Sequence, residues 1–335
     1  MIPRTIPTWQ SKSWQEELSS LITDPAELFS LLKLDASLLP SAIASSRLFP
    51  LRSTRAFVER IQPGNINDPL LRQILPLDAE QENHNEYSLD PLEEAEFTPI
   101  PGLIHKYTGR VLLVAANQCA INCRYCFRRH FDYQGNSPSR EQWNDAFQYI
   151  RNNTSIDEVI LSGGDPLAIS DKQLGWMVSQ IEEIPHISRL RIHSRLPIMA
   201  PSRVTPTLID TLSSTRLSTV MVIHCNHSQE IDEDVATALD LLKTSGCTLL
   251  NQSVLLKDVN DSEQALTELS LTLFRQGVLP YYLHLLDKVT GTSHFNVELA
   301  RARSLYQALL ANLPGYLVPK LVKETPNAPS KVPII

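Results

Sequence analysis

Residues 111–126 read VLLVAANQCAINCRYC, an apolar run followed by a cluster of cysteines. The opening VLLVAA is apolar and rich in branched side chains, which is typical of a buried strand. Cys119, Cys123 and Cys126 come soon after it, so the sequence places them at the carboxyl end of that strand. The chain has five cysteines, an odd number, and three of them lie within eight residues. Such clustering favours metal ligands over a framework of disulfide bonds.

Apolar runs like the one at 111–116 recur along the chain, at 157–162, 189–194, 218–223, 247–252 and 279–286. Successive runs start 46, 32, 29, 29 and 32 residues apart, which is the length of one βα unit. Helical patterns fill the intervals, at 139–151, from Ser170, from Thr205, at 230–246, at 262–277 and at 298–311. Six alternating units predict an α/β fold with a parallel sheet, either open and doubly wound or curled into a barrel.

The first hundred residues lack this regular alternation of strand and helix patterns. They carry short helical patterns, at 13–22, 25–33, 54–61 and 68–75. The stretch 78–98 is acidic and polar, which is typical of an exposed connector. We therefore expect a helical region with its connector at 1–100, an α/β core at 105–323 and a Pro-rich tail at 324–335.

Composition narrows the classes of function. Lys and Arg number 30 against 37 Asp and Glu, which gives a net charge of −7. An acidic chain is a poor candidate for binding nucleic acid or an anionic membrane through bulk charge. We find no apolar run long enough to cross a bilayer and no hydrophobic secretory signal, so we expect a cytoplasmic protein.

The three clustered cysteines are spaced C-x₃-C-x₂-C. Three thiolates on one loop can bind three irons of a four-iron cubane, which leaves the fourth iron open for chemistry. The alternative is a structural zinc site, in which His130 completes a Cys₃His set. The chain has no second CxxC pair, which favours the cluster over zinc.

Polar residues follow the later apolar runs, where the carboxyl ends of parallel strands would gather into one rim. The segment Ser162-Gly163-Gly164-Asp165-Pro166 comes directly after the second run. Its glycines let the backbone approach a ligand and Asp165 offers an acceptor, although such a segment is also typical of a plain turn. The other runs are followed by Ser194 and Arg195, His224 and Asn226, Asn251 and Gln252, and Asp287.

The cysteine spacing, with aromatic Tyr125 before the last cysteine, resembles the radical S-adenosylmethionine (SAM) enzymes. The resemblance implies a full or partial (β/α) barrel, often of six units, and a [4Fe-4S] cluster on the three cysteines. The open iron of that cluster would bind SAM, which one electron cleaves to methionine and a 5′-deoxyadenosyl radical. The residues predicted to bind a cofactor here are Tyr125, Gly163, Gly164, Asp165, His224 and Gln252. In the family, the Gly-Gly-acidic segment binds the methionine amino group.

Longer segments narrow the resemblance, namely PGLIHKYTGRVLLV (101–114), CRYCFRRH (123–130), LSGGDPL (161–167), RIHSRLP (191–197), NQSVLLKDVND (251–261) and PYYLHLLD (280–287). Together they resemble the lysine 2,3-aminomutase family, over residues 90–331. That family adds pyridoxal phosphate, carried by a lysine near the C-terminus. The matching segment here is APSKVP at 328–333, so the resemblance implies that Lys331 carries the cofactor and is catalytic.

The same resemblance implies roles for four more residues. Arg110 is similar to the arginine that neutralises the cofactor phosphate, and Arg128 to the one that clamps the substrate carboxylate. Asp287 is similar to one of two acids that hold the substrate ε-ammonium. The second acid lies seven residues before the cofactor lysine, where this chain has Glu324 in place of Asp.

The implied activity is an isomerase that converts free L-α-lysine into β-lysine, with a one-electron reductant of the flavodoxin or ferredoxin type. The chain ends four residues after Lys331, which is similar to the shorter branch of the family. That branch supplies (R)-β-lysine, which a separate ligase attaches to elongation factor P. The alternatives are a catabolic or biosynthetic aminomutase without that link, an iron–sulfur protein without mutase activity, and a zinc-stabilised protein.

Overall fold

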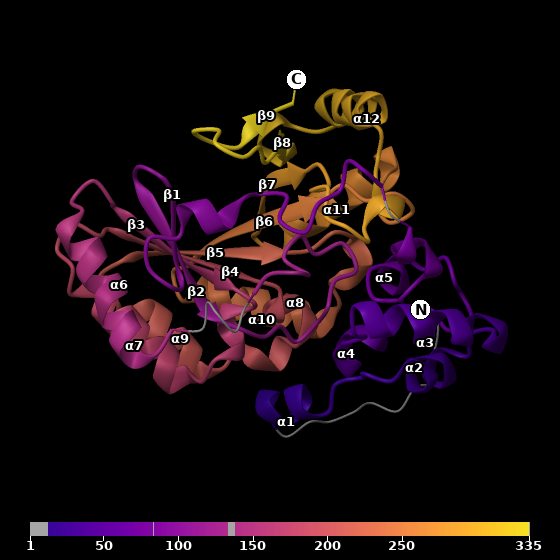
Figure 1. Cartoon of the computed structure of the whole chain (residues 1–335), viewed down its shortest axis with the longest axis horizontal. Helices are drawn as coiled ribbons and strands as arrows, with labels where there is room; N and C mark the ends of the chain where they lie inside the picture. The colour runs from indigo at the N-terminus through magenta and orange to yellow at the C-terminus, as the bar shows by residue number, and fades with distance from the viewer. Residues whose placement is uncertain (1–12, 83, 133–137, 335) are drawn as a thin grey trace.

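A single nine-stranded sheet organises the protein, in a computed structural model that describes residues 13–82, 84–132 and 138–334. Its strands are β1 (Leu103–Tyr107), β2 (Arg110–Ala116), β3 (Glu158–Gly163), β4 (Arg189–Ser194), β5 (Ser218–His224), β6 (Thr248–Val254), β7 (Leu279–His284), β8 (Lys320–Lys323) and β9 (Val332–Pro333). The strands lie in chain order, and β2 to β8 are parallel. Strands β1 and β9 pair antiparallel with β2 and β8 at the two edges (Figure 1). The predicted α/β fold with a partial barrel is confirmed.

The six predicted runs coincide with β2 to β7. The last run is shorter than predicted, since β7 ends at His284 and the next residues form a loop. The sequence analysis missed β1, β8 and β9. β1 and β8 are short and carry charged residues, as in LIHKY and KLVK, and β9 has only two residues, so no apolar alternation marks them.

Helices fill the intervals between the parallel strands, namely α6 (Arg140–Asn152), α7 (Asp171–Glu182), α8 (Leu196–Met199), α9 (Pro206–Ser214), α10 (Glu233–Thr244), α11 (Glu263–Arg275) and α12 (Leu299–Asn312). The predicted start signals are real caps, because the Ser139, Ser170 and Thr205 side chains accept from the first turns of α6, α7 and α9. Each such cap contributes about 1 kcal/mol. Helix α10 begins three residues later than predicted because Asp232 caps it.

The two faces of the sheet differ in polarity. Leu190 and Ile192 of β4 are buried in the core that the helices cover, together with Leu161 of β3. Arg191 and His193 alternate with them, so they point to the opposite face. The helix-facing side of the sheet is therefore apolar, whereas its inner side carries polar groups.

The amino-terminal helices are α1 (Trp14–Ser19), α2 (Pro25–Leu32), α3 (Leu39–Leu48), α4 (Arg55–Val58) and α5 (Pro69–Arg72). The last four contribute to a core of their own, whereas Leu18 of α1 packs against the main core. Figure 1 shows the last four (indigo) gathered at one end of the molecule. Ile121 of the cysteine loop and Met199 of α8 belong to the same core. This region is thus joined to the cysteine loop by shared packing. The division into residues 1–100, 105–323 and 324–335 stays a proposal.

The acidic stretch 78–98 differs from its prediction. Glu80, in the 3₁₀ turn Asp78–Gln81, and Glu94, in the 3₁₀ turn Glu94–Phe97, are both buried. They are buried because each pairs with arginines of the segment 124–129. The prediction of an exposed connector is wrong for these two residues.

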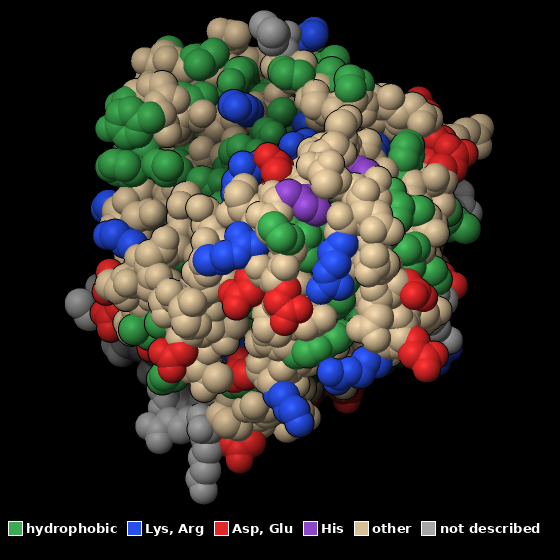
Figure 2. Space-filling model, turned by 90° about the vertical axis from the view of Figure 1, so that its left-hand side faces the viewer, with side chains coloured by type: hydrophobic (Ala, Val, Ile, Leu, Met, Phe, Trp, Pro, Cys, Tyr) green, Lys and Arg blue, Asp and Glu red, His purple; other side chains and the backbone are tan. Residues whose placement is uncertain are grey.

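The face of the protein in Figure 2 carries both basic and acidic side chains, as expected from 30 Lys and Arg against 37 Asp and Glu. Acidic and basic side chains are mixed there, close to histidine side chains, and neither sign forms a continuous patch. Within the described residues, no helix is both long and apolar enough to span a membrane.

Candidate active site

The cysteine loop leaves β2 at Ala116, and its backbone is held from outside by the amino-terminal region. The Asn122 N–H donates to the Arg52 carbonyl at 3.0 Å, and the Arg124 N–H donates to the Gln73 carbonyl at 3.0 Å. Within the loop, the Cys126 N–H donates to the Cys123 carbonyl at 2.9 Å. The loop shape is therefore set by protein contacts.

Cys119, Cys123 and Cys126 are free, partly exposed thiols. Across the described residues, no three His, Cys, Asp or Glu side chains converge on a single ion position. His130, the fourth ligand of the zinc alternative, is exposed and places its Nε2 3.2 Å from the Thr290 carbonyl oxygen. A cubane spreads its thiolates over separate irons, so its ligands need not converge on one point. This donor set fits the cluster better than a zinc ion.

Three arginines lie within or just after the cysteine cluster, and buried carboxylates neutralise them. Arg124 and Glu80 are both fully buried and form a two-point ion pair. The Arg129 Nη2 lies 2.9 Å from the same Glu80 carboxylate. The sequence analysis missed Glu80 and Glu94. A usable signal was present, because arginines beside an apolar loop require counter-charges, and the nearest acidic run is 78–98.

Arg128 is held along one side of its guanidinium. Its Nε and Nη2 donate to the two oxygens of Glu94 at 2.8 and 2.6 Å. Its Nη1 lies 3.4 Å from the Ser162 Oγ and from the Gly163 carbonyl oxygen. The guanidinium therefore reaches the carboxyl end of β3, beside the cysteine loop.

The Gly-Gly-Asp segment packs directly against the cysteine loop. Gly163 has φ +110°, and a Cβ on Gly164 would lie 2.4 Å from the Gln118 carbonyl oxygen, so both positions require glycine. The Asp165 carboxylate accepts from the Ser194 hydroxyl at 2.7 Å and from three backbone N–H groups, those of residues 167, 195 and 196. Asp165 thus ties β3 to β4, and its predicted contact with a methionine amino group stays a proposal.

Four strands send polar side chains into the inner side of the sheet, and their buried atoms lack hydrogen-bond partners within the described residues. These atoms are Nε2 of His193, His224 and His284 and Oε1 of Gln252. Burial, together with nearby positive charges, lowers the pKa of His224 and of His284 to about 3, so both imidazoles are neutral at pH 7. Buried polar atoms are normally paired. Their lack of partners therefore marks this interior as a ligand site.

Comparison with known proteins decides which family this site belongs to. Residues 113–269 match the Radical SAM superfamily. The chain is 47% identical to "L-lysine 2,3-aminomutase" of Escherichia coli (strain K12) over 98% of this chain and 96% of that relative. It is 46% identical to the Haemophilus influenzae protein of the same name, over 96% and 95%. The chain belongs to the lysine 2,3-aminomutase family.

The aminomutase family also includes a protein from Clostridium subterminale that is 36% identical, over 84% of this chain and 68% of that relative. Among solved structures, a radical SAM methyltransferase from Sphaerobacter thermophilus aligns over 66% of this chain and 68% of its own, with 15% identity and a TM-score of 0.46. Membership makes the protein a radical SAM isomerase and implies a [4Fe-4S] cluster and SAM. When bound, these supply the radical that starts the reaction.

The tail of this aminomutase folds back along the sheet. Strand β9 pairs with β8, with Lys323 opposite Val332, so the segment between them forms a turn. Lys331 and Glu324 lie at the two ends of this turn and form an ion pair. Although burial alone would raise it, the ion pair with Lys331 holds the pKa of Glu324 at about 2.

The Lys331 amine faces aromatic and charged groups of other strands. Its Nζ lies 5.7 Å from the centre of the Tyr282 ring of β7. The Tyr107 hydroxyl of β1 donates to Glu324 at 3.0 Å. The tail therefore contacts both β1, at one edge of the sheet, and β7, near the other edge.

Arg110 and Asp287 interact electrostatically with the residues around Lys331. Arg110 acts on Tyr282, and Asp287 is influenced by Glu324 and Lys331. The Arg110 guanidinium stacks 4.5 Å from the centre of the Tyr107 ring, and its charge opposes the rise that burial causes in the pKa of Tyr282. Burial and then the Glu324 carboxylate raise the pKa of Asp287 to about 7, while Lys331 opposes that rise. An amine, a guanidinium and aromatic rings in one place fit a phosphorylated pyridine cofactor.

Proposed function

We propose that this protein converts free L-α-lysine into (R)-β-lysine, with pyridoxal phosphate carried by Lys331. The observation that carries the proposal is the position of the Lys331 amine. It lies beside Tyr282 and Glu324, and its charge influences the pKa of His193, His224 and His284 in the barrel interior. The pKa of His224 is lowered by burial, by Arg195, which contacts Cys123, and by Lys331 of the tail.

The proposed roles follow from charge and position. Arg128, held by Glu94 at the carboxyl end of β3, would bind the substrate carboxylate. Asp287 with Glu324 would bind the ε-ammonium. Arg110 would face the cofactor phosphate. Pyridoxal phosphate, when bound, supplies the conjugated ring that delocalises an unpaired electron during nitrogen migration.

The remaining roles concern SAM. Tyr125, Gly163, Gly164, Asp165, His224 and Gln252 would line its site between the cysteine loop and the barrel interior. The neutral His224 and Gln252 atoms without partners can each make one hydrogen bond to it without bringing a charge into the dry interior. Water exclusion by this interior would protect a carbon radical from quenching.

The test of the lysine role is anaerobic reconstitution with iron, sulfide and pyridoxal phosphate, followed by SAM, a reductant and L-lysine. We expect β-lysine among the separated amino acids. Borohydride reduction should fix a pyridoxyl group on Lys331, found by peptide mass spectrometry. Lys331→Ala should lose both the adduct and the product, whereas Lys320→Ala, an exposed lysine on the adjacent β8, should keep both. An adduct on another lysine contradicts the assignment.

We further propose that a separate ligase attaches the β-lysine to elongation factor P. The enzyme would be cytoplasmic and would take its electron from a flavodoxin or ferredoxin. Support comes from the near-complete mutual coverage with the Escherichia coli and Haemophilus influenzae relatives. A deletion strain should lack the β-lysyl group on that factor in intact-mass spectra. Reintroducing the gene, but not its Lys331→Ala variant, should restore the added mass. An unchanged mass in the deletion strain would exclude this link.

A further inference from the structure

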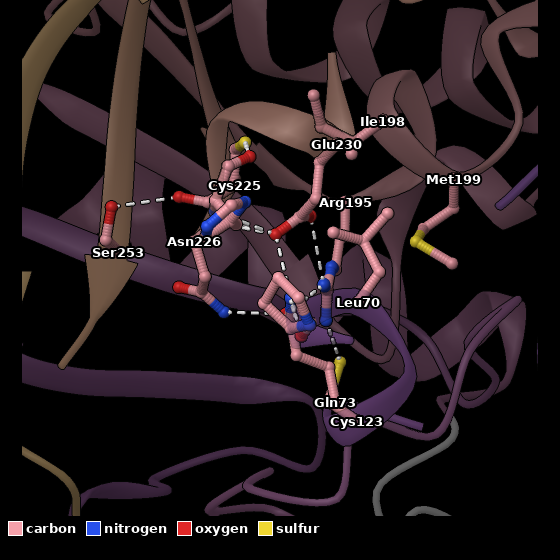
Figure 3. A network of polar contacts seen from close by, with 12 residues as sticks. Leu70, Gln73, Cys123, Arg195, Ile198, Met199, Cys225, Asn226, Glu230 and Ser253 are labelled. Carbon is pink, nitrogen blue, oxygen red and sulfur yellow. Dashed lines mark hydrogen bonds and ion pairs between the residues drawn. The ribbon is translucent and has the colours of Figure 1, made fainter. Parts of the chain in front are cut away.

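Arg195 is a buried cation beside one of the cysteines. It follows β4 directly, is 4% exposed, and its Nη1 lies 2.7 Å from the Cys123 Sγ (Figure 3). The arginines of the cysteine loop itself face carboxylates and backbone carbonyls instead. The Arg195 guanidinium is thus a full positive charge placed against a thiol that the family assigns to the cluster.

Several elements fix this guanidinium in place. Its Nη2 donates to Gln73 Oε1 at 2.6 Å and lies 3.1 Å from Glu230 Oε2, and its Nη1 also donates to the Tyr125 hydroxyl at 2.6 Å. Gln73 caps the end of α5, Tyr125 belongs to the cysteine loop and Glu230 lies after β5. Contacts from three separate segments leave the guanidinium little freedom to turn away from Cys123.

The counter-charge of Arg195 is itself rigidly held. Glu230 is fully buried, and its Oε1 accepts from Gln73 Nε2 at 3.0 Å and from the backbone N–H groups of Asn226 and His227 at 2.9 and 3.0 Å. The carboxylate contacts one end of the guanidinium while the sulfur contacts the other, as Figure 3 shows. The pair therefore forms a fixed dipole whose positive end faces Cys123.

Such a dipole acts on the redox state of an iron–sulfur cluster. Hydrogen bonds to cluster sulfurs and the charge around a cluster set its reduction potential. In the reduction step the oxidised cluster accepts one electron from an external one-electron donor. No bond forms or breaks and no proton moves, so the cluster gains one negative charge. A guanidinium at a ligand sulfur stabilises that added charge, and does so strongly because the surroundings are dry.

We propose that Arg195, positioned by Glu230 and Gln73, raises the reduction potential of the cluster through its hydrogen bond to the Cys123 sulfur. This role makes the cluster reducible by a biological one-electron donor. It depends on the cluster that the family implies and is independent of the lysine chemistry at Lys331.

Two variants test the proposal with opposite expected signs. Arg195→Met removes the charge and keeps a side chain of similar length, so the reduced cluster should become harder to form. Glu230→Gln removes the counter-charge, while Gln73 and Tyr125 still hold the guanidinium, so reduction should become easier. We expect each change to alter the ratio of reduced to oxidised cluster at fixed potential by tenfold or more, in opposite directions, and tenfold corresponds to 59 mV for one electron.

The measurement is a dye-mediated potentiometric titration of the reconstituted protein without SAM, followed by the electron paramagnetic resonance signal of the reduced cluster. Arg203→Met is the matched control, because Arg203 is also a fully buried arginine but contacts Asp171 and the Leu167 carbonyl instead of a cysteine. Its midpoint should match the wild type even if its stability falls.

The outcomes separate the possible causes. Unchanged midpoints in both variants, or shifts of the same sign, would overturn the proposal, because a structural role does not predict opposite shifts. If Arg195→Met fails to load a cluster, Glu230→Gln decides alone, and an unchanged midpoint there overturns it. A wild-type protein that assembles no cluster would instead refute the radical chemistry on which the proposed function rests.

Discussion

Replacing Asp287 with alanine is expected to lower kcat/KM for L-lysine by roughly 30- to 5,000-fold. The proposed role pairs this carboxylate with the substrate ε-ammonium, and truncating one partner of a buried charge pair costs about 2–5 kcal/mol. Most of the loss should be in KM, since the ammonium lies far from the carbon atoms that react. Steady-state kinetics on the reconstituted enzyme measures it.

The pH dependence of lysine binding gives an independent signature. Burial and Glu324 raise the pKa of Asp287 from 3.8 to about 7. As pH falls below 7 the carboxyl group is protonated and loses its attraction for the ammonium, so KM should rise by up to about tenfold per pH unit. Asp287→Asn should have a higher KM throughout and lose this dependence.

The Asp287 carboxyl also makes stability depend on pH, and in the opposite direction: high pH favours lysine binding but lowers the free energy of unfolding. The folded carboxyl keeps its proton up to about pH 7, whereas the unfolded chain releases it near the ordinary value of 3.8. Between these values the folded state binds more protons, so the free energy of unfolding falls as pH rises, by at most about 4 kcal/mol. Asp287→Asn should therefore unfold at higher urea than the wild type at pH 8.

Asp258→Asn is the control for both measurements. Asp258 is exposed, lies in the loop after β6 and has φ +61°, which asparagine tolerates. Its lysine kinetics and urea midpoint should match the wild type. Near-normal KM in Asp287→Ala, or a wild-type KM that is flat between pH 6 and 8, would show that Asp287 does not bind the ammonium.

Replacing Glu80 with glutamine is expected to lower the free energy of unfolding by about 3–5 kcal/mol. Glu80 is the shared counter-charge of Arg124 and Arg129, and the Arg124–Glu80 pair is fully buried. Without the carboxylate, two guanidinium groups stay in a dry site with no negative partner among these contacts. Urea unfolding followed by circular dichroism measures the change.

Glu82→Gln is the matched control for Glu80. Glu82 lies two residues away, but its side chain is 67% exposed, so its variant should stay within about 0.5 kcal/mol of the wild type. The Glu80 variant should also bind less iron, because Arg124 anchors the cysteine loop to the amino-terminal region. Equal stability of the two variants would contradict the assigned role of the ion pairs.

The regular part of the fold could be predicted from sequence because its signals are local. Strands β2 to β7 are contiguous apolar runs, and the caps at Ser139, Ser170 and Thr205 depend on residues three positions apart. The cysteines could be found for the same reason, since all their spacing information lies within one loop. Strand β8, four residues long and flanked by exposed lysines, carries no such signal and forms only because β7 offers an edge.

The polar framework of the site could not be predicted, because its partners are distant in sequence. Glu94 and Arg128 are 34 residues apart, and Gln73 and Arg195 are 122 apart. Charge alone suggests exposure for Glu80. The sequence can suggest that the acidic run 78–98 supplies counter-charges, but only the folded chain reveals which of its carboxylates pair with the arginines. The Lys331 tail is a similar case, since a lysine near a chain end is ordinarily solvated, whereas here β9 returns it to the sheet.

The backbone contacts that Arg52 and Gln73 make to the cysteine loop bear on how the metal centre matures. Many small metal-binding proteins fold only when the ion arrives, so that assembly and folding are one event. In this enzyme the loop conformation is already dictated by a neighbouring helical core. Iron and sulfide delivery should therefore be a loading step on a finished scaffold, and the far-ultraviolet circular dichroism spectrum should be the same before and after it.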